Sequence, residues 1–284
     1  HLGAHGESEN GINTGPVFLS ERKLYEVNFK PFKAAIQDGG ALVVMPNYNE
    51  LSGIPAHANE WLLTEVLRKN WGFEGIVLSD YHATPNLIEE HFVAKDSVAA
   101  GVMAIKAGVD MELTDDFMYQ GLPVAMKKGM ITPEYIDKAV LHVLRLKFEL
   151  GLFDNPYYDE GKAGIVGSDK HREVALDAAR QSIVLLKNDD GILPIDRNKY
   201  KKVALIGPNA DRCILGGYSG IPKTESTPLK AMREKYSDTE ILYAEGCKLS
   251  INRSNYGGTK LVPLEEDRAL IQRAVETASE ADII

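Results

Sequence analysis

The chain has 284 residues, of which 44% are hydrophobic and 26% charged, a composition typical of a globular protein with one large domain or two ordinary ones. Its formal net charge of −9 argues against a nucleic-acid-binding surface, because phosphate binding requires clustered lysine and arginine. No apolar run is long enough to span a bilayer, so we expect neither nucleic acid nor membrane as a partner. The two cysteines, Cys213 and Cys247, fit neither a disulfide framework nor a metal-site spacing.

The first half alternates strand and helix patterns, which favours an α/β fold with a parallel sheet. The last helix has the clearest ends, with Thr132 as N-cap, Pro133 at the first helical position and Gly151 as the stop. Strands are expected within residues 39–48, 74–81 and 109–113, and helices within 58–72, 93–108 and 132–151.

A change in composition separates the two halves. Residues 153–171 are rich in glycine and polar side chains, which is typical of a linker. We therefore divide the chain into a first domain at residues 1–158, a linker at 159–170 and a second domain at 171–284. The second half is expected to contain a helix from residue 172 that becomes a strand near Ile183, strands within 201–211 and 239–247, a helix at 265–282 and a strand starting at 283.

Asp80 is placed where a buried strand ends, in the stretch GIVLSDYHAT, and Tyr81 follows it. In a parallel α/β domain the carboxyl ends of the strands form the active-site edge. A carboxylate next to an aromatic ring at this edge suits sugar chemistry, because the ring packs on sugar C–H groups and the carboxylate can attack an anomeric carbon. The alternative is that Asp80 caps the following helix.

Two other strand ends carry polar or aromatic residues. The first has Met45, Asn47 and Tyr48, and the third has Asp110 and Glu112. Residues two apart on a strand share a face, so the two carboxylates could act as a pair. A hydrogen-bonded structural role is the alternative, and the one we favour.

The opening HLGAHGESENG contains His1, His5, Glu7 and Glu9. The glycines make a helix implausible there, so a loop lining a polar pocket is favoured over a metal site. Three isolated histidines are expected to be surface or packed residues rather than ligands: His57, His82 and His91.

Two glycine-containing loops of the second half bear on ligand binding. LIGPNAD lacks the glycine pattern of a dinucleotide turn. LGGYSG, residues 215–220, is a flexible loop that either approaches a ligand closely or is an ordinary surface turn.

Several stretches together resemble glycoside hydrolase family 3, the exo-acting β-glucosidases and β-xylosidases. They are HLGAHGESENGINTGPVFLSER, VVMPNYNELSGIPAHANEWLLTEVLRKNWGFEGIVLSDY, AIKAGVDMEL, VLRLKFELGLFDNPY, SIVLLKNDDGILPI and VALIGPNAD. They follow the family's order over nearly the whole chain. The resemblance implies the C-terminal part of a (β/α)8-type barrel followed by the first part of an αβα sandwich, and hence an internal piece of a longer protein.

The resemblance also implies roles for individual residues. Asp80 occupies the position of the catalytic nucleophile, and Tyr81 stands where many members have tryptophan. His1 matches the histidine of a sugar-binding Lys-His pair. Met45 and Tyr48 match sugar-contacting residues, and Ser219 matches a serine of the sandwich domain that reaches the next subsite. No metal or organic cofactor is implied.

Two departures from the family bear on specificity and rate. Many members have an arginine soon after the Lys-His pair, and here Glu7 or Glu9 is expected to bind hydroxyls instead. The acid/base glutamate is expected beyond residue 284. The resemblance thus implies a retaining β-glucosidase acting on β-linked oligosaccharides or aryl glycosides, with a β-xylosidase, a β-N-acetylglucosaminidase or a non-catalytic sugar-binding derivative as alternatives. A homodimer is left open, and no compartment is indicated.

Overall fold

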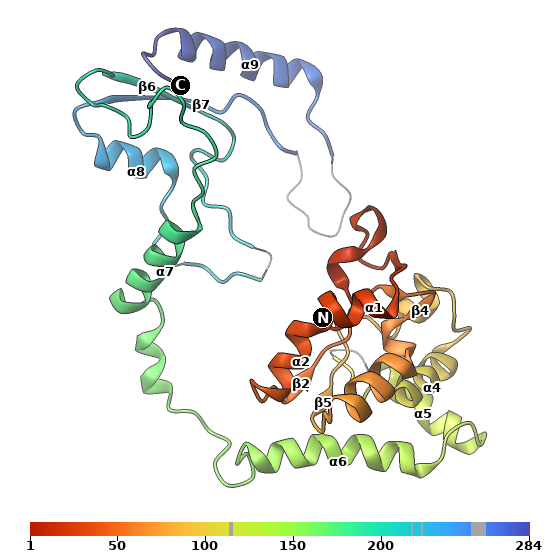
Figure 1. Cartoon of the computed structure of the whole chain (residues 1–284). Coiled ribbons are helices and arrows are strands. Elements are labelled where there is room, and N and C mark those ends of the chain that lie inside the picture. The colour runs from red at the N-terminus through yellow and green to blue at the C-terminus, as the bar shows by residue number, and fades with distance from the viewer. Residues whose placement is uncertain (114–115, 217, 223, 251–259) are drawn as a thin grey trace. The chain divides into compact units, whose positions relative to one another are not determined.

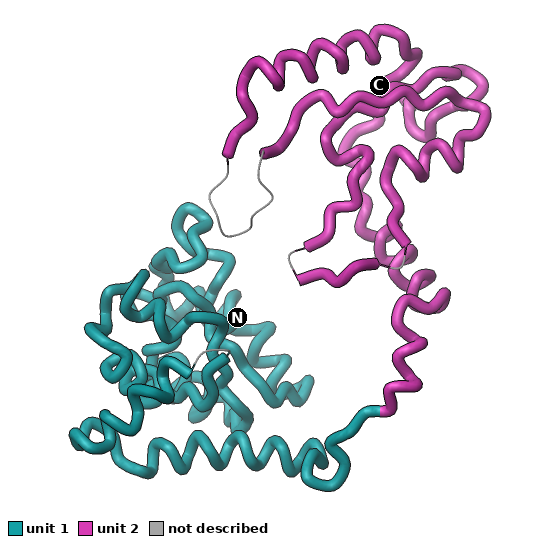
Figure 2. Tube along the Cα trace, turned by 180° about the vertical axis from the view of Figure 1, so that it is seen from behind, with its two compact units in different colours: residues 1–158 teal, residues 159–284 magenta. Residues whose placement is uncertain are grey.

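The computed structural model describes residues 1–113, 116–216, 218–222, 224–250 and 260–284 (Figure 1). The chain forms two compact units, His1–Tyr158 and Asp159–Ile284, which are coloured separately in Figure 2. Each unit mixes helices with short parallel strands, so the fold class is α/β.

The first unit contains the candidate site residues of the first half. Its elements are η1 (His5–Glu7), η2 (Glu9–Gly11), β1 (Pro16–Val17), α1 (Glu21–Lys23), η3 (Leu24–Asn28), α2 (Lys30–Gln37), β2 (Val43–Val44), β3 (Glu50–Leu51), β4 (Ile54–Pro55), η4 (Ala56–Ala58), η5 (Trp61–Asn70), β5 (Ile76–Val77), α3 (Asn86–Glu89), α4 (Ser97–Ala107), α5 (Phe117–Lys127) and α6 (Pro133–Glu149).

Short parallel pairings in chain order bring the strand ends of the first unit to one edge. Leu2 bridges to Pro46, β2 pairs with β5, and Leu78 bridges to Met111, all in parallel. The expected strand at 109–113 is reduced to the bridge between Leu78 and Met111. The backbone N–H groups after Met111 donate to side chains instead of to a partner strand. Glu112 N–H donates to the Tyr119 hydroxyl and Leu113 N–H to Ser79 Oγ. Separately, β3 lies between β1 and β4 in a small sheet.

The helix expected at 58–72 forms η5, a π-helical segment that contributes much of the core. Asn59 Oδ1 accepts from Leu62 N–H at 3.0 Å near its start, and Gly72 follows its end with φ +73°. Its buried side chains belong to the same core cluster as Val44 of β2 and Val77 of β5: Leu62, Leu63, Val66 and Leu67. The hydrophobic side of this segment thus contributes to the core that also buries β2 and β5.

The second unit has its own small core around a parallel pair of strands. Its elements are η6 (Glu160–Ile165), α7 (Asp169–Ser182), β6 (Lys202–Ile206), α8 (Pro228–Lys235), β7 (Glu240–Ala244) and α9 (Leu264–Ser279). β6 pairs with β7 from Lys202↔Glu240 to Ile206↔Ala244, and Val203 bridges to Ile283. The segment placed in a linker by its composition contains η6.

The strand predicted near Ile183 is wrong. Residues 183–188 follow α7 without strand structure, and Ile183 is 77% exposed. A strand requires a partner for its backbone groups, and within the described residues none pairs with this segment. Among the helices of the described ranges, none is long and apolar enough to cross a membrane.

Candidate active site

Asp80 lies directly after β5, and its neighbours are tied to the next chain segment. Ser79 N–H donates to the Met111 carbonyl at 2.8 Å, and Ser79 Oγ accepts from Leu113 N–H at 2.8 Å. Ser79 is fully buried, whereas Asp80 retains 9% exposure. Two hydrogen bonds therefore tie the strand end beside Asp80 to the segment at residues 111–113.

The two carboxylate oxygens of Asp80 have different surroundings. Oδ1 accepts from the Tyr81 amide at 2.7 Å, and Oδ2 lies 3.0 Å from His1 Nδ1. The first helix after it, α3, begins at Asn86 and receives no side-chain cap. Asp80 is therefore not a helix cap, which removes the structural alternative left open by the sequence.

Three residues with ring side chains are connected at this carboxylate: His1, Tyr48 and Tyr81. The His1 ring stacks near Tyr48, with ring centres 6.4 Å apart, and the Tyr48 hydroxyl donates to the Tyr81 carbonyl at 2.6 Å. The Tyr81 side chain is 53% exposed. The structure therefore brings together His1, Tyr48, Asp80 and Tyr81, as a sugar subsite would require.

Three other residues expected at the site make contacts with other parts of the chain. Met45 is half-buried, and its carbonyl accepts from Leu2 N–H at 2.8 Å. Glu7 is paired with Lys23 at 3.0 Å and accepts from Asn28, and these hydrogen bonds lower the pKa of its carboxyl group. Ser219 belongs to the second unit, where its amide donates to the Gly216 carbonyl.

Asp110 and Glu112 have structural partners, as favoured from the sequence. Asp110 accepts from Arg68 at 2.5 Å, from Val77 N–H at 2.8 Å and lies 2.7 Å from His142 Nδ1. Glu112 accepts from the Thr84 hydroxyl and from the Met118 amide at the start of α5. Both carboxylates therefore join elements of the sheet and its helices.

The two histidines of the opening loop lie against each other. The rings of His1 and His5 stack with centres 5.3 Å apart. Within the described ranges, no group of three or more His, Cys, Asp or Glu side chains could hold a metal ion. His1 instead faces the Asp80 carboxylate.

Family comparison accounts for both units. Residues 1–146 match the glycosyl hydrolase family 3 N terminal domain, and residues 183–284 match the glycosyl hydrolase family 3 C-terminal domain. The chain belongs to glycosyl hydrolase family 3. The resemblance seen in the sequence is thereby confirmed.

The individual relatives that the chain matches are named β-xylosidases and β-glucosidases. A β-xylosidase from Formosa agariphila is 37% identical over 88% of this chain and 37% of its own length. A periplasmic β-glucosidase from Salmonella typhimurium is 35% identical over the whole chain and 39% of its own length. The solved structure of a β-glucosidase from Erythrobacter marinus matches with a TM-score of 0.88 and 34% identity, covering 98% of this chain and 38% of that one. The chain thus spans less than two fifths of these relatives.

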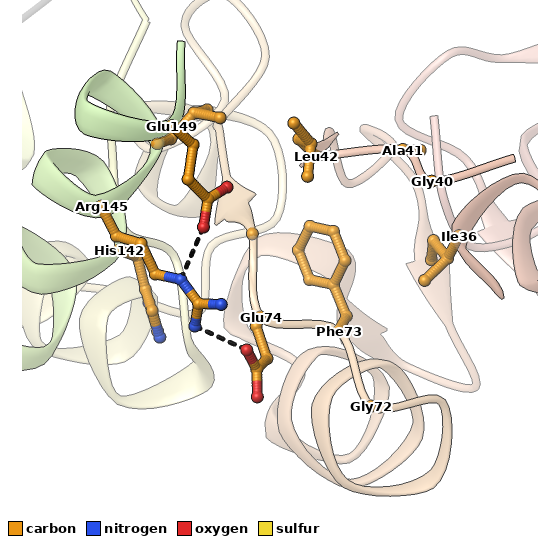
Figure 3. A pocket seen from close by; sticks show the side chains of 12 residues that line it. Ile36, Gly40, Ala41, Leu42, Gly72, Phe73, Glu74, His142, Arg145 and Glu149 are labelled. Atoms are coloured by element: carbon orange, nitrogen blue, oxygen red, sulfur yellow. Dashed lines mark hydrogen bonds and ion pairs between the residues drawn. The ribbon is translucent and has the colours of Figure 1, made fainter. Parts of the chain in front are cut away.

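A hollow in this family 3 chain lies at the amino ends of β2 and β5, opposite the ends that lead to Asp80. It has a volume of about 240 Å³, and Leu42 and Gly75, just before β2 and β5, line it. Figure 3 shows Arg145 between Glu149 and Glu74, at 2.8 and 2.5 Å. This hollow is separate from the edge that carries Asp80, and its charged groups are paired with each other.

One close neighbour of Asp80 was missed by sequence reasoning. His57 was expected to be a surface or packed residue, and it is packed, at 2% exposure. Its Nε2 accepts from the Asp80 backbone N–H at 3.2 Å. No local pattern announces this contact, since 23 residues separate the two positions and only the fold joins them.

Proposed function

We propose that this chain is part of a retaining exo-β-glycosidase that removes non-reducing terminal β-D-glucosyl residues through a covalent glycosyl-Asp80 intermediate. The observation that carries the proposal is the Asp80 carboxylate, which is held at a strand end by the Tyr81 amide and faces the His1 ring beside Tyr48. Family membership supports the reaction class, and the β-glucosidases among the relatives support the sugar.

In this proposal Asp80 attacks the anomeric carbon, and water later releases the sugar with retained configuration. The Tyr81 amide holds Oδ1, which leaves Oδ2 on the side of His1 as the attacking oxygen. His1 is assigned to a sugar hydroxyl, and the exposed ring of Tyr81 to the apolar face of the same sugar. Met45 and Tyr48 complete this subsite, while Glu7 is assigned to a neighbouring hydroxyl contact.

We also propose that residues 1–158 form the last part of a (β/α)8-type barrel, and that residues 171–284, after a linker at 159–170, begin an αβα sandwich. The parallel pairings in chain order, from Leu2 to Met111, support the barrel. The parallel β6–β7 pair beside α8 and α9 supports the sandwich.

A β-xylosidase is the second candidate. It is favoured by the relative named β-xylosidase, which is 37% identical to this chain. The engagement of Glu7 with Lys23 does not decide between the sugars, because a carboxylate can accept further hydrogen bonds. Both candidates use the same nucleophile and differ only in the pocket around the sugar.

Mechanism-based trapping tests the proposal on the longest available polypeptide that contains this chain. The protein is treated with 2-fluoro-glucosyl and 2-fluoro-xylosyl reagents that have good leaving groups, and the added mass is located by peptide mapping. We expect an adduct on Asp80, and the faster reagent identifies the preferred sugar. Since Asp80→Asn replaces the carboxylate nucleophile by a neutral amide, that variant should form no adduct and lose hydrolysis.

The matched control is Asp96→Asn. Asp96 caps α4 by accepting from Ala99 N–H, and asparagine caps a helix about equally well, so this change removes a carboxylate without removing its structural role. Its trapping rate should equal that of the wild type. An adduct on another residue, in protein that hydrolyses aryl glycosides, would refute the assignment of Asp80.

A further inference from the structure

We propose that His57 is a positioning residue for the nucleophile, acting as a neutral imidazole that accepts the backbone N–H of Asp80. The inference rests on the proposed function of Asp80 and adds the group that fixes its main chain. The hydrogen bond of His57 to the nucleophile is made through the Asp80 backbone N–H and not through the carboxylate. Its effect would therefore pass entirely through the nucleophile's backbone.

The ring of His57 connects two neighbouring strand ends. It lies in η4, after the small sheet and before η5, and it is 2% exposed. One nitrogen, Nε2, accepts from Asp80 N–H at 3.2 Å, just after β5. The ring also hydrogen-bonds the backbone of Asn47, which follows β2. One side chain therefore sets the spacing between the ends of β2 and β5.

These two bonds assign the tautomer. A nitrogen that accepts a hydrogen bond has no proton, so the proton of the neutral ring is on Nδ1. The bond with the Asn47 backbone is the one that favours a protonated nitrogen. A doubly protonated ring could not accept from Asp80, and the amide of the nucleophile would then be buried without its partner.

The surroundings keep the ring neutral. Burial is the main cause that lowers the pKa of His57 to about 4; the charge of Asp80 partly opposes it, and the nearby His91 acts in the same direction as burial. His91 itself lies 3.1 Å from Glu50 and 2.9 Å from the Tyr48 carbonyl. At ordinary pH values the imidazole is therefore present as an acceptor for the amide of Asp80.

The consequence for chemistry is the location of the attacking oxygen. The Asp80 amide is held by His57, and the Asp80 carbonyl accepts from Ser79 Oγ and Ala83 N–H. Without the bond to His57, the N–H of the Ser79–Asp80 peptide has lost its acceptor. That peptide can then rotate, which moves the Asp80 side chain. Misplacement of a reacting group by about 1 Å can reduce a rate about 100-fold, so this bond matters most for the attack itself.

Two substitutions separate the two bonds of the ring. In His57→Gln the terminal amide can reach the Nε2 position and accept from Asp80. In His57→Asn the shorter amide reaches the Nδ1 position, so the bond with Asn47 is kept and the acceptor for Asp80 is lost. Both variants are polar and buried, so their costs in stability should be similar.

The matched control is Asn59→Ala, two residues along the chain. Asn59 Oδ1 accepts the buried Leu62 N–H, so this variant also removes the acceptor of one buried amide, but not that of the nucleophile. The full-length protein and each variant are compared by the rate constant of trapping with the preferred 2-fluoro-glycosyl reagent. Inhibitor affinity and tryptophan fluorescence report on binding and folding.

We expect His57→Asn to lower the trapping rate constant 10- to 100-fold with inhibitor affinity within about threefold of the wild type. His57→Gln should stay within about fivefold, and Asn59→Ala within about twofold. Equal loss in His57→Asn and Asn59→Ala, or a loss above tenfold in folded His57→Gln, would overturn the inference. If His57→Asn does not fold, the result for His57→Gln decides. Failure of wild-type protein to trap on Asp80 would instead refute the proposed function, and the inference with it.

Discussion

The stability of the first unit should depend on pH through His57. Burial lowers the pKa of this histidine from 6.5 to about 4 in the folded protein, whereas the unfolded chain keeps the ordinary value. Between these two pH values the unfolded state binds a proton that the folded state excludes. The free energy of unfolding therefore contains a contribution that is complete above pH 6.5 and is lost progressively as the pH falls to about 4.

The size of this contribution follows from the two pKa values. Since one pKa unit corresponds to about 1.4 kcal/mol, the full effect is about 3 kcal/mol. His57→Gln places a group there that does not titrate. The difference in unfolding free energy, wild type minus variant, should therefore fall by about 3 kcal/mol between pH 7 and pH 4. Other titrating groups act in both proteins and cancel in the difference.

Urea unfolding followed by tryptophan fluorescence measures this difference. The chain has two tryptophans, Trp61 and Trp71, and both lie in the first unit, so the signal does not report on the second. Asn59→Ala is the control, because its difference from the wild type should not change with pH. A difference between wild type and His57→Gln that is constant from pH 7 to pH 4 would show that His57 is not held neutral by burial.

Three further substitutions test the framework of the first unit, each by its urea midpoint. Arg68→Ala leaves the buried carboxylate of Asp110 without its guanidinium, which should cost about 3–5 kcal/mol. Gly75→Ala should cost about 3 kcal/mol, because a Cβ there would lie 2.1 Å from the Leu42 carbonyl oxygen. Glu112→Gln keeps one acceptor of two and should cost about 1 kcal/mol. Losses below 0.5 kcal/mol would contradict the respective contacts.

The helices that were expected from the sequence carry local signals, whereas α2, α5 and α8 were not expected. Thr132, Pro133 and Gly151 mark both ends of α6, which the structure gives as Pro133–Glu149. The strand near Ile183 could not be decided in this way, since its apolar run is equally compatible with an unpaired segment. The segment after Val109 shows the same limit, because side-chain acceptors replace the partner strand there.

The candidate site was predictable in part for a similar reason. Asp80 and Tyr81 could be predicted because an apolar strand pattern ends at a carboxylate that is followed by an aromatic residue. Whether Asp110 and Glu112 are reactive or structural depends on the donors around them, and several of these come from segments far away in the sequence, such as Arg68 in η5 and His142 in α6. His57 carries no signal in its own segment, since its role is defined by an amide 23 residues away.

The donors around each carboxylate separate a candidate nucleophile from a structural acid. Asp110 accepts from Arg68 and from Val77 N–H, faces His142, and its side chain is 4% exposed. The oxygens of Asp110 are therefore engaged by groups of the protein that hold the fold together. Asp80 has one oxygen held by an amide of its own turn, and the other faces His1, whose side chain is 45% exposed. An attacking oxygen needs a lone pair that substrate can reach, and this arrangement supports Asp80 in that role.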